Sequence, residues 1–223
     1  MPEACISLLS IEDPGMESPA ETRERLKDRF PRGAGRRMTQ LGHLVGATIQ
    51  NIGATGGEPI VYASANGEAR ALEAFLDSFP SPSPTLFQTS IHPSGVQQAL
   101  VATQRPVHQF FPMTGSHRLA ARALEVALLC DSPRVILCGG EERGTWMLEH
   151  GAASDRTFAF AMTLARNQES ALGRIRLDQR PATSTPGSKA PALTLPHFFD
   201  LLRTRTPFSG LIASGQWLTL TWT

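Results

Sequence analysis

Residues 117–141 read HRLAARALEVALLCDSPRVILCGGE, and this stretch decides the fold class. From His117 to Cys130 it is rich in alanine and leucine, which favour a helix. Asp131-Ser132-Pro133 ends that helix, because a proline cannot continue it. Arg134 to Cys138 is a short apolar run that predicts a buried strand leading into Gly139-Gly140. A helix followed closely by a buried strand is typical of α/β proteins.

The same alternation extends along the chain in both directions. Further strands are predicted at Ile6–Ile11, Ile60–Ser64, Val107–Met113, Thr157–Leu164 and Gln216–Trp222, the last of them an edge strand. Further helices are predicted at Pro19–Asp28, Met38–Ile52, Glu68–Phe79, His92–Thr103 and Leu195–Arg203. Strands interleaved with helices predict an α/β fold with a mixed, mostly parallel sheet flanked by helices.

We expect residues 1–223 to form a single domain. A chain of 223 residues can bury a core without disulfides or a structural metal. The proline-rich segment at residues 80–84 is too short to link independent domains, so we predict a rigid loop there. Residues 179–191 are rich in Pro, Ser, Thr and Gly, which predicts a flexible loop.

The composition excludes several classes of protein. Hydrophobic residues make up 41% of the chain and charged residues 18%, unlike a disordered tail or a coiled coil. A formal net charge of +1 gives no overall field that would attract nucleic acid. No apolar run is long enough to span a bilayer, and the first residues do not resemble a signal peptide. We therefore expect a soluble, cytoplasmic protein with neither a membrane span nor a nucleic-acid partner.

Residue patterns that would indicate catalysis or cofactor binding are largely missing. None of the 6 histidines lies at metal-ligand spacing from another His or Cys. The glycine cluster at residues 53–57 precedes a strand, whereas a nucleotide-binding loop follows one. Ser116 beside His117 suggests a nucleophile and its base, but adjacent residues seldom face each other and no orienting acid is evident. The sequence therefore predicts neither a metal site nor a cofactor.

Three segments in the middle of the chain resemble the N-terminal half of a β-ketoacyl-acyl carrier protein synthase, which has a thiolase fold. Residues 63–68, ASANGE, are similar to the Ser-x-x-Gly-Glu turn of that family. Ser81-Pro82 and FQTSIH at residues 87–92 resemble its Ser-Pro and Phe-x-x-Ser-Val-His-Asn motifs, with Pro93 replacing the Asn. VILCGGE at residues 135–141 resembles its strand ending in Ala-Gly-Gly-Glu. The segments occur in the family's order.

An active ketosynthase carries its cysteine at the start of the helix after the central strand, where the helix dipole lowers the thiol pKa. The resemblance places Gly115 at the cysteine position to within about one residue, with Thr114 and Ser116 beside it. None of the three is a cysteine, and the family's two catalytic histidine motifs are also missing from the chain. The resemblance therefore implies a homologue without catalytic residues.

Such an inactive homologue is the chain length factor of aryl-polyene and type II polyketide systems. The resemblance implies that the chain pairs with a catalytic ketosynthase and meets acyl carrier protein through that complex. Thiolase-fold proteins dimerise through the edge strand before the nucleophile helix, which points to Val107–Met113. The expected interface and tunnel residues are Phe87, Phe110, Phe111 and Met113. The alternative for Phe110 and Phe111 is packing in the chain's own core, because a strand directs alternate residues inward.

Two other functions stay open at this point. The chain could be a small stand-alone enzyme for acyl transfer or hydrolysis that uses Ser116 or a cysteine. It could also be a purely structural scaffold for the ketosynthase, in which case the length of the product would not depend on this chain.

Overall fold

The strands form an eight-stranded sheet that includes segments from both ends of the chain. The computed structural model describes residues 2–35, 37–104, 106–167, 170–179 and 193–223. The strand order is β3-β2-β4-β5-β1-β6-β8-β7. The strands are β1 (Glu3–Gly15), β2 (Ile60–Ser64), β3 (Phe110–Thr114), β4 (Arg134–Glu141), β5 (Thr157–Ala165), β6 (Gly173–Gln179), β7 (Phe208–Ala213) and β8 (Gln216–Trp222).

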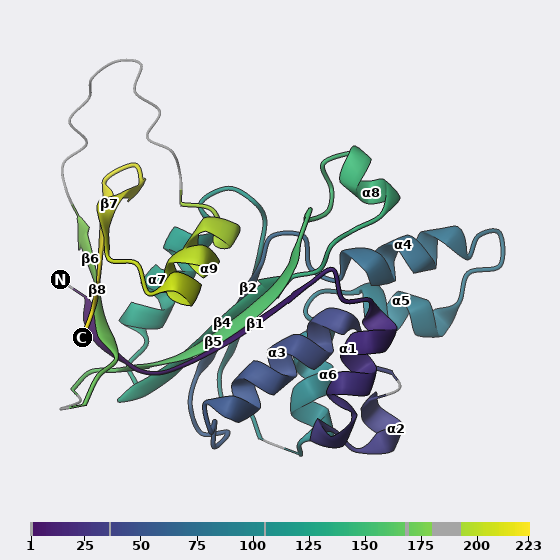
Figure 1. Ribbon diagram of the computed structural model, residues 1–223, viewed down its shortest axis with the longest axis horizontal. Coiled ribbons are helices and arrows are strands. Elements are labelled where there is room, and N and C mark those ends of the chain that lie inside the picture. Colours follow the sequence, from purple (N-terminus) through teal and green to yellow (C-terminus); the bar gives the residue numbers. More distant parts are fainter. Residues whose placement is uncertain (1, 36, 105, 168–169, 180–192) are drawn as a thin grey trace.

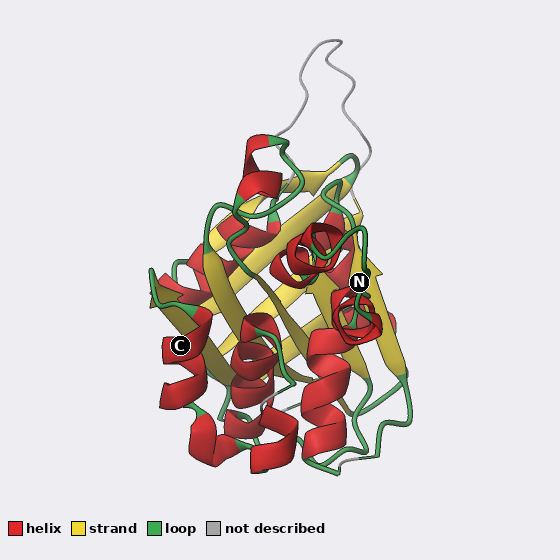
Figure 2. Ribbon diagram, turned by 90° about the vertical axis from the view of Figure 1, so that its right-hand side faces the viewer, coloured by secondary structure: helices red, strands yellow, loops and turns green. Residues whose placement is uncertain are grey.

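Helices cover both faces of this sheet. They are α1 (Pro19–Arg25), the 3₁₀ turn η1 (Lys27–Arg29), α2 (Arg32–Gly35), α3 (Gln40–Asn51), α4 (Ala69–Asp77), α5 (Pro84–Ser90), α6 (Ser94–Ala102), α7 (Leu119–Leu129), α8 (Trp146–Glu149) and α9 (Leu195–Thr204). Figure 1 shows α7 and α9 on one side of the strands and α1, α3 and α6 on the other. The helices that face the viewer in Figure 2 lie across the strands behind them.

The sheet is mixed, as predicted, but most of its strand pairs are antiparallel. Strand β2 pairs in parallel with β3 and β4. The other five pairs of neighbouring strands are antiparallel within the described chain. The α/β prediction with helices on both faces is confirmed, whereas the prediction of a mostly parallel sheet is wrong. The reason is that the strands do not follow a series of helical crossovers: β1 pairs with β5 and β6, which lie far along the chain, and β7 and β8 form a hairpin.

Two strands that the sequence pattern missed, β6 and β7, explain most of this difference. Strand β8 pairs with β6 on one side and with β7 on the other. The prediction that Gln216–Trp222 is an edge strand is therefore wrong, because β7 lies outside it. Gln179 ends β6, so the predicted flexible loop begins one residue too early, and the rest of that prediction lies outside the described residues.

The core consists of two main hydrophobic clusters, one on each face of the sheet. Strand β5 shows the division, because all of its residues are buried. Phe158, Phe160 and Met162 join the cluster under α7 and α9. Ala159 and Ala161 join the cluster under α3 and α6. Large side chains on one face and alanines on the other let α3 approach the sheet closely.

Local capping chemistry sets several helix boundaries. Helix α1 begins with a capping box, in which the Ser18 N–H donates to Glu21 Oε2 at 2.7 Å and the Glu21 N–H donates to Ser18 Oγ at 3.3 Å. Ser83 caps α5 and Pro84 occupies its first turn, so the proline-rich loop leads directly into a helix that the sequence pattern missed. Across the part of the chain described, no helix combines the length and apolar character needed to cross a bilayer.

Candidate functional site

Strand β3 lies at one edge of the sheet, where the sequence predicts the interface. It pairs with β2 and has no neighbour on its other side among the described residues. The N–H of Ile60 donates to the C=O of Gln109 at 3.0 Å, so Gln109 directs its carbonyl toward β2. Because backbone groups alternate along a strand, Phe110 and Pro112 direct theirs toward the open edge. This edge can therefore accept a further strand, although Pro112 supplies no N–H to it.

The four predicted interface residues do not gather on one surface. Phe110 is half-buried and packs against the cluster under α3 and α6. Met113 packs against the cluster under α7, on the opposite face of the sheet. Phe111 is 36% exposed, and strand alternation places it on the same face as Met113. Phe87 lies apart from β3 on α5, where its ring centroid is 5.3 Å from that of Phe75.

The turn after β3 occupies the place where the resemblance puts the lost nucleophile. Thr114 ends the strand, and its hydroxyl donates to the C=O of Ala65 at 3.4 Å. Gly115 has a φ of +104°, a conformation that favours glycine over cysteine. Ser116 is exposed, and helix α7 begins at Leu119. The turn thus contains no thiol, and its backbone disfavours one at residue 115.

The first and third motif segments meet at Glu141, directly beneath this turn. Glu141 ends β4 and is buried. Its carboxylate accepts hydrogen bonds from the Ala65 N–H, from the Asn66 N–H at 3.1 Å and from Asn66 Nδ2 at 3.2 Å. The C=O of Ala65 in turn accepts from Thr114. This carboxylate holds the loop after β2 and supports the turn after β3 through it.

The second motif segment joins the first through His92 and Glu68. The His92 ring stacks on Tyr62 with centroids 5.1 Å apart, and its Nδ1 lies 3.6 Å from Glu68 Oε2. The other oxygen of Glu68 accepts from the Gly95 N–H at 2.8 Å. Gly67 has a φ of +59°, and a Cβ there would lie 3.3 Å from His92 Nδ1. The three motif segments therefore form one packed unit around the carboxyl ends of β2 and β4.

Comparison with solved structures identifies the same architecture. The chain matches a structure described as the ketosynthase ApeO in complex with its chain length factor ApeC from Xenorhabdus doucetiae. The TM-score is 0.66 at 17% identity, covering 97% of this chain and 98% of that chain. The chain has a ketosynthase-like fold.

Two further matches are more distant. The ishigamide ketosynthase/chain length factor matches with a TM-score of 0.57 at 11% identity, covering 81% of this chain and 68% of that chain. A β-ketoacyl synthase from Burkholderia phymatum matches with a TM-score of 0.54 at 12% identity, covering 80% of this chain and 54% of that chain. No family model and no curated protein matches the sequence.

The alternative nucleophiles of this ketosynthase-like chain are poorly placed for catalysis. Burial raises the pKa of the Cys138 thiol far above its usual range and also raises the pKa of the Cys130 thiol. Cys5 is buried in β1. Ser116 and His117 are both exposed, and no hydrogen bond joins them in the described structure. An activated nucleophile of the kind that the stand-alone enzyme requires is thus missing from these candidates.

Sequence reasoning missed two further buried carboxylates of the ketosynthase-like fold. Glu142 accepts from the Leu41 N–H at 3.3 Å and from the Arg70 N–H at 3.0 Å. Glu73 accepts from the Thr145 N–H at 2.7 Å and from the Met147 N–H at 2.9 Å. The sequence signal for Glu142 is its position directly after β4, a strand that is buried from Val135 onward. Glu142 thus binds amides at the starts of α3 and α4, and Glu73 binds amides at the start of α8. The described residues contain no cluster of metal-ligating side chains.

Burial also changes the ionisation of the two adjacent glutamates. It raises the pKa of Glu141 to about 7 and that of Glu142 to about 7, against the opposing effect of their hydrogen bonds from backbone amides. An ordinary Glu in the unfolded chain has a pKa of about 4.3, so the folded state binds more protons between these values. Stability contributed by these groups is therefore fully present below the unfolded pKa and is lost as pH rises through about 7.

We expect Glu141→Gln and Glu142→Gln to reduce this loss of stability. Glutamine is isosteric with the protonated carboxyl group and does not titrate. Each substitution is expected to remove about 1–3 kcal/mol of the decrease in unfolding free energy between about pH 5 and pH 8. Urea unfolding at several pH values measures the effect. The matched control is Glu149→Gln, at an exposed glutamate of α8, which should follow the parent protein. Equal pH profiles for all four proteins would contradict the assignment.

Proposed function

We propose that the chain is a non-catalytic chain length factor that pairs with an active β-ketoacyl-acyl carrier protein synthase and shapes its acyl tunnel. The observation that carries this proposal is the turn at residues 114–118, which enters α7 without a thiol. A ketosynthase acylates a cysteine at this position, so a chain without it depends on a partner for the chemistry.

The size of the matched protein supports the same proposal. The match includes 97% of this chain and 98% of the chain from the ApeO–ApeC complex, so the two chains are of similar length. A protein of this size and fold therefore occurs in a ketosynthase–chain length factor complex. We extend this to aryl-polyene synthesis, with residues 1–223 acting as one ketosynthase-like domain in the cytoplasm.

The open edge of β3 gives the partner a place to bind. A ketosynthase strand that pairs there would continue the sheet across both subunits. The partner would supply the cysteine, both histidines and the decarboxylative condensation. This chain would supply a wall of the tunnel near Met113, and acyl carrier protein would deliver substrates to the complex.

Co-expression with an intact ketosynthase tests the pairing. We expect a one-to-one complex by size exclusion with light scattering, and poorer solubility of this chain alone, because the apolar edge strand is then uncovered. A well-behaved monomer that ignores the ketosynthase would contradict the proposal.

Intact-mass spectrometry of the complex tests the absence of catalysis. After incubation with an acyl carrier protein thioester, the acyl group should appear on the ketosynthase chain and not on this chain, which lacks a thiol in the turn before α7. The control is the same incubation with the ketosynthase cysteine replaced by alanine, which should leave both chains unmodified. A stable adduct on Ser116, Cys130 or Cys138 would support the stand-alone enzyme instead.

A further inference from the structure

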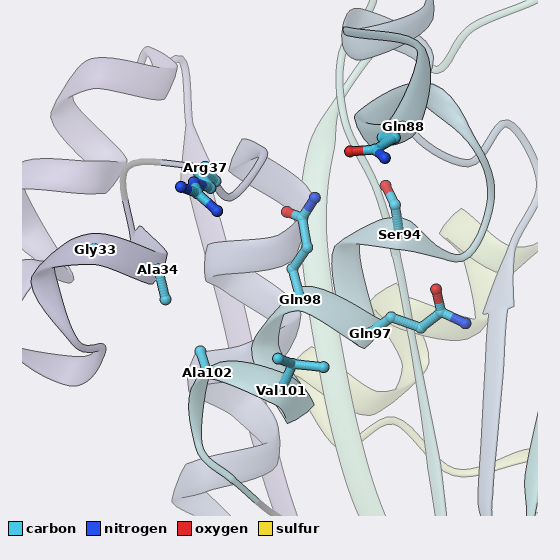
Figure 3. Close-up of a pocket in the computed structure, with 9 residues that line it drawn as sticks. All are labelled: Gly33, Ala34, Arg37, Gln88, Ser94, Gln97, Gln98, Val101 and Ala102. Atoms are coloured by element: carbon cyan, nitrogen blue, oxygen red, sulfur yellow. The ribbon is translucent and has the colours of Figure 1, made fainter. Parts of the chain in front are cut away.

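A cavity of about 630 Å³ lies on the α6 side of the molecule, away from the turn that precedes α7. Helix α6 runs along it, with the segment around α2 on one side and α5 on the other (Figure 3). Its lining residues are Gly33, Ala34, Arg37, Gln88, Ser94, Gln97, Gln98, Val101 and Ala102. The volume is within the range of pockets that bind small ligands.

Most polar side chains of this cavity have hydrogen-bonding groups without a partner among the described residues. Arg37, Gln88 and Gln97 form no side-chain hydrogen bond or ion pair in the described structure. The Oε1 atom of Gln98 is buried without a hydrogen-bond partner. Ser94 Oγ donates to the C=O of Thr89 at 2.6 Å and keeps its capacity to accept. A buried carbonyl oxygen without a donor costs free energy, which a ligand N–H would recover.

The charge of the lining favours an anion. Among the described residues that line the cavity, Arg37 is charged and none is acidic. Elsewhere in the chain many arginines pair with carboxylates; examples are Arg25 with Glu17 and Arg156 with Asp200. An exposed guanidinium at the rim of a cavity, without a carboxylate, can bind a phosphate through two parallel hydrogen bonds.

From these features we infer that the cavity binds a phosphate ester that carries amide groups, the chemistry of a 4′-phosphopantetheine arm. Arg37 binds the phosphate, and Gln88, Gln97 and Gln98 exchange hydrogen bonds with the amides of the arm. Val101 and Ala102 contact its short aliphatic parts. The choice of this arm rests on the proposed function, because carrier-bound acyl chains hang from such an arm.

The cavity is separate from the proposed tunnel. Helix α6 packs through Val96 and Leu100 on the cluster under α3, whereas α7 covers the opposite face of the sheet. The arm could come free, as in coenzyme A, or attached to acyl carrier protein. In the second case this chain itself would contact the carrier protein, rather than meet it only through the ketosynthase.

Calorimetric titration with 4′-phosphopantetheine and pantetheine as probes tests the inference. The protein is used alone or, if it is poorly soluble alone, as its complex with the ketosynthase. The phosphorylated probe should bind about tenfold or more tightly than pantetheine, because it alone engages Arg37. Arg37→Glu should remove this difference, and Gln98→Leu should weaken both probes. The matched control is Arg122→Glu, at an exposed arginine of α7 on the other face, which should bind as the parent does.

Two further experiments distinguish a free phosphopantetheine group from one attached to carrier protein. Coenzyme A that competes with 4′-phosphopantetheine supports the free form. Carrier protein that binds with its arm attached, but not without it, and that loses affinity in Arg37→Glu supports the tethered form. Equal binding of both probes, or equal loss in Arg37→Glu and Arg122→Glu, would overturn the inference. Complex formation with the ketosynthase is measured separately, so failure of the cavity and failure of the pairing are distinguishable.

Discussion

Phe111→Asp is expected to weaken the complex with the ketosynthase by about 100-fold or more while the chain itself stays folded. Phe111 is 36% exposed on the edge strand β3, so an aspartate there remains hydrated in the isolated chain. In the complex the same position would lie beside the joined strands, where an unpaired carboxylate is strongly disfavoured. Surface plasmon resonance with immobilised ketosynthase measures the affinity.

The control for this experiment is Leu129→Asp. Leu129 is 63% exposed and ends α7, at the far end of that helix from the turn after β3. It introduces the same charge at an exposed apolar residue and should leave the affinity unchanged. Circular dichroism of both variants reports on folding. If Phe111→Asp binds as tightly as the parent protein, β3 is not the interface strand.

Elements with strong local signals could be predicted from the sequence. The strand Ile60–Ser64 is confirmed at both ends, because a run of apolar and β-branched residues follows a loop that ends in a proline. The capping box of Ser18 and Glu21 also fixes the start of α1. In such places the chemistry of a few adjacent residues determines the structure.

Strand direction could not be predicted in the same way. The apolar sequence of β5 is compatible with either parallel or antiparallel neighbours, so it does not reveal the direction of pairing. Its antiparallel pairing with β1 and β4 depends on distant parts of the chain. Strand β6 was missed because it has no continuous apolar run; Arg174 and Arg176 separate Gly173, Ile175 and Leu177. That alternation is itself a strand signal for a sheet with one polar face.

In the candidate site, too, local features could be predicted from the sequence and contacts between distant residues could not. The motif segments were identified from the sequence, but the contacts between them join residues that lie far apart along the chain. Glu141 binds the loop at residues 65–66, and Glu68 reaches Gly95. The opposite orientation of Phe110 and Met113 follows from strand alternation, but only once the ends of β3 are known.

That orientation decides which residue we expect to limit product length. Met113 lies on the α7 face, next to Thr114 and the turn where the resemblance places the nucleophile of ketosynthases, whereas Phe110 lies on the α3 and α6 face. Met113→Trp is therefore expected to shorten the polyene by filling space beside the partner's tunnel. Phe110→Ala, which removes a ring from the other face, should leave product length unchanged. Absorption spectra and the mass of carrier-bound products measure the length.

Heterodimer yield is the control, because large-to-small changes at packed sites can cost about 3–5 kcal/mol and could dissociate the complex. Met113→Leu, which nearly conserves volume, should give the parent product and separates the effect of added bulk from that of substitution itself. If complexes form normally and Met113→Trp makes the parent product, this chain is a scaffold that does not set length. If Phe110→Ala alone lengthens the product, the tunnel wall lies on the α6 face, and Met113 has no part in it.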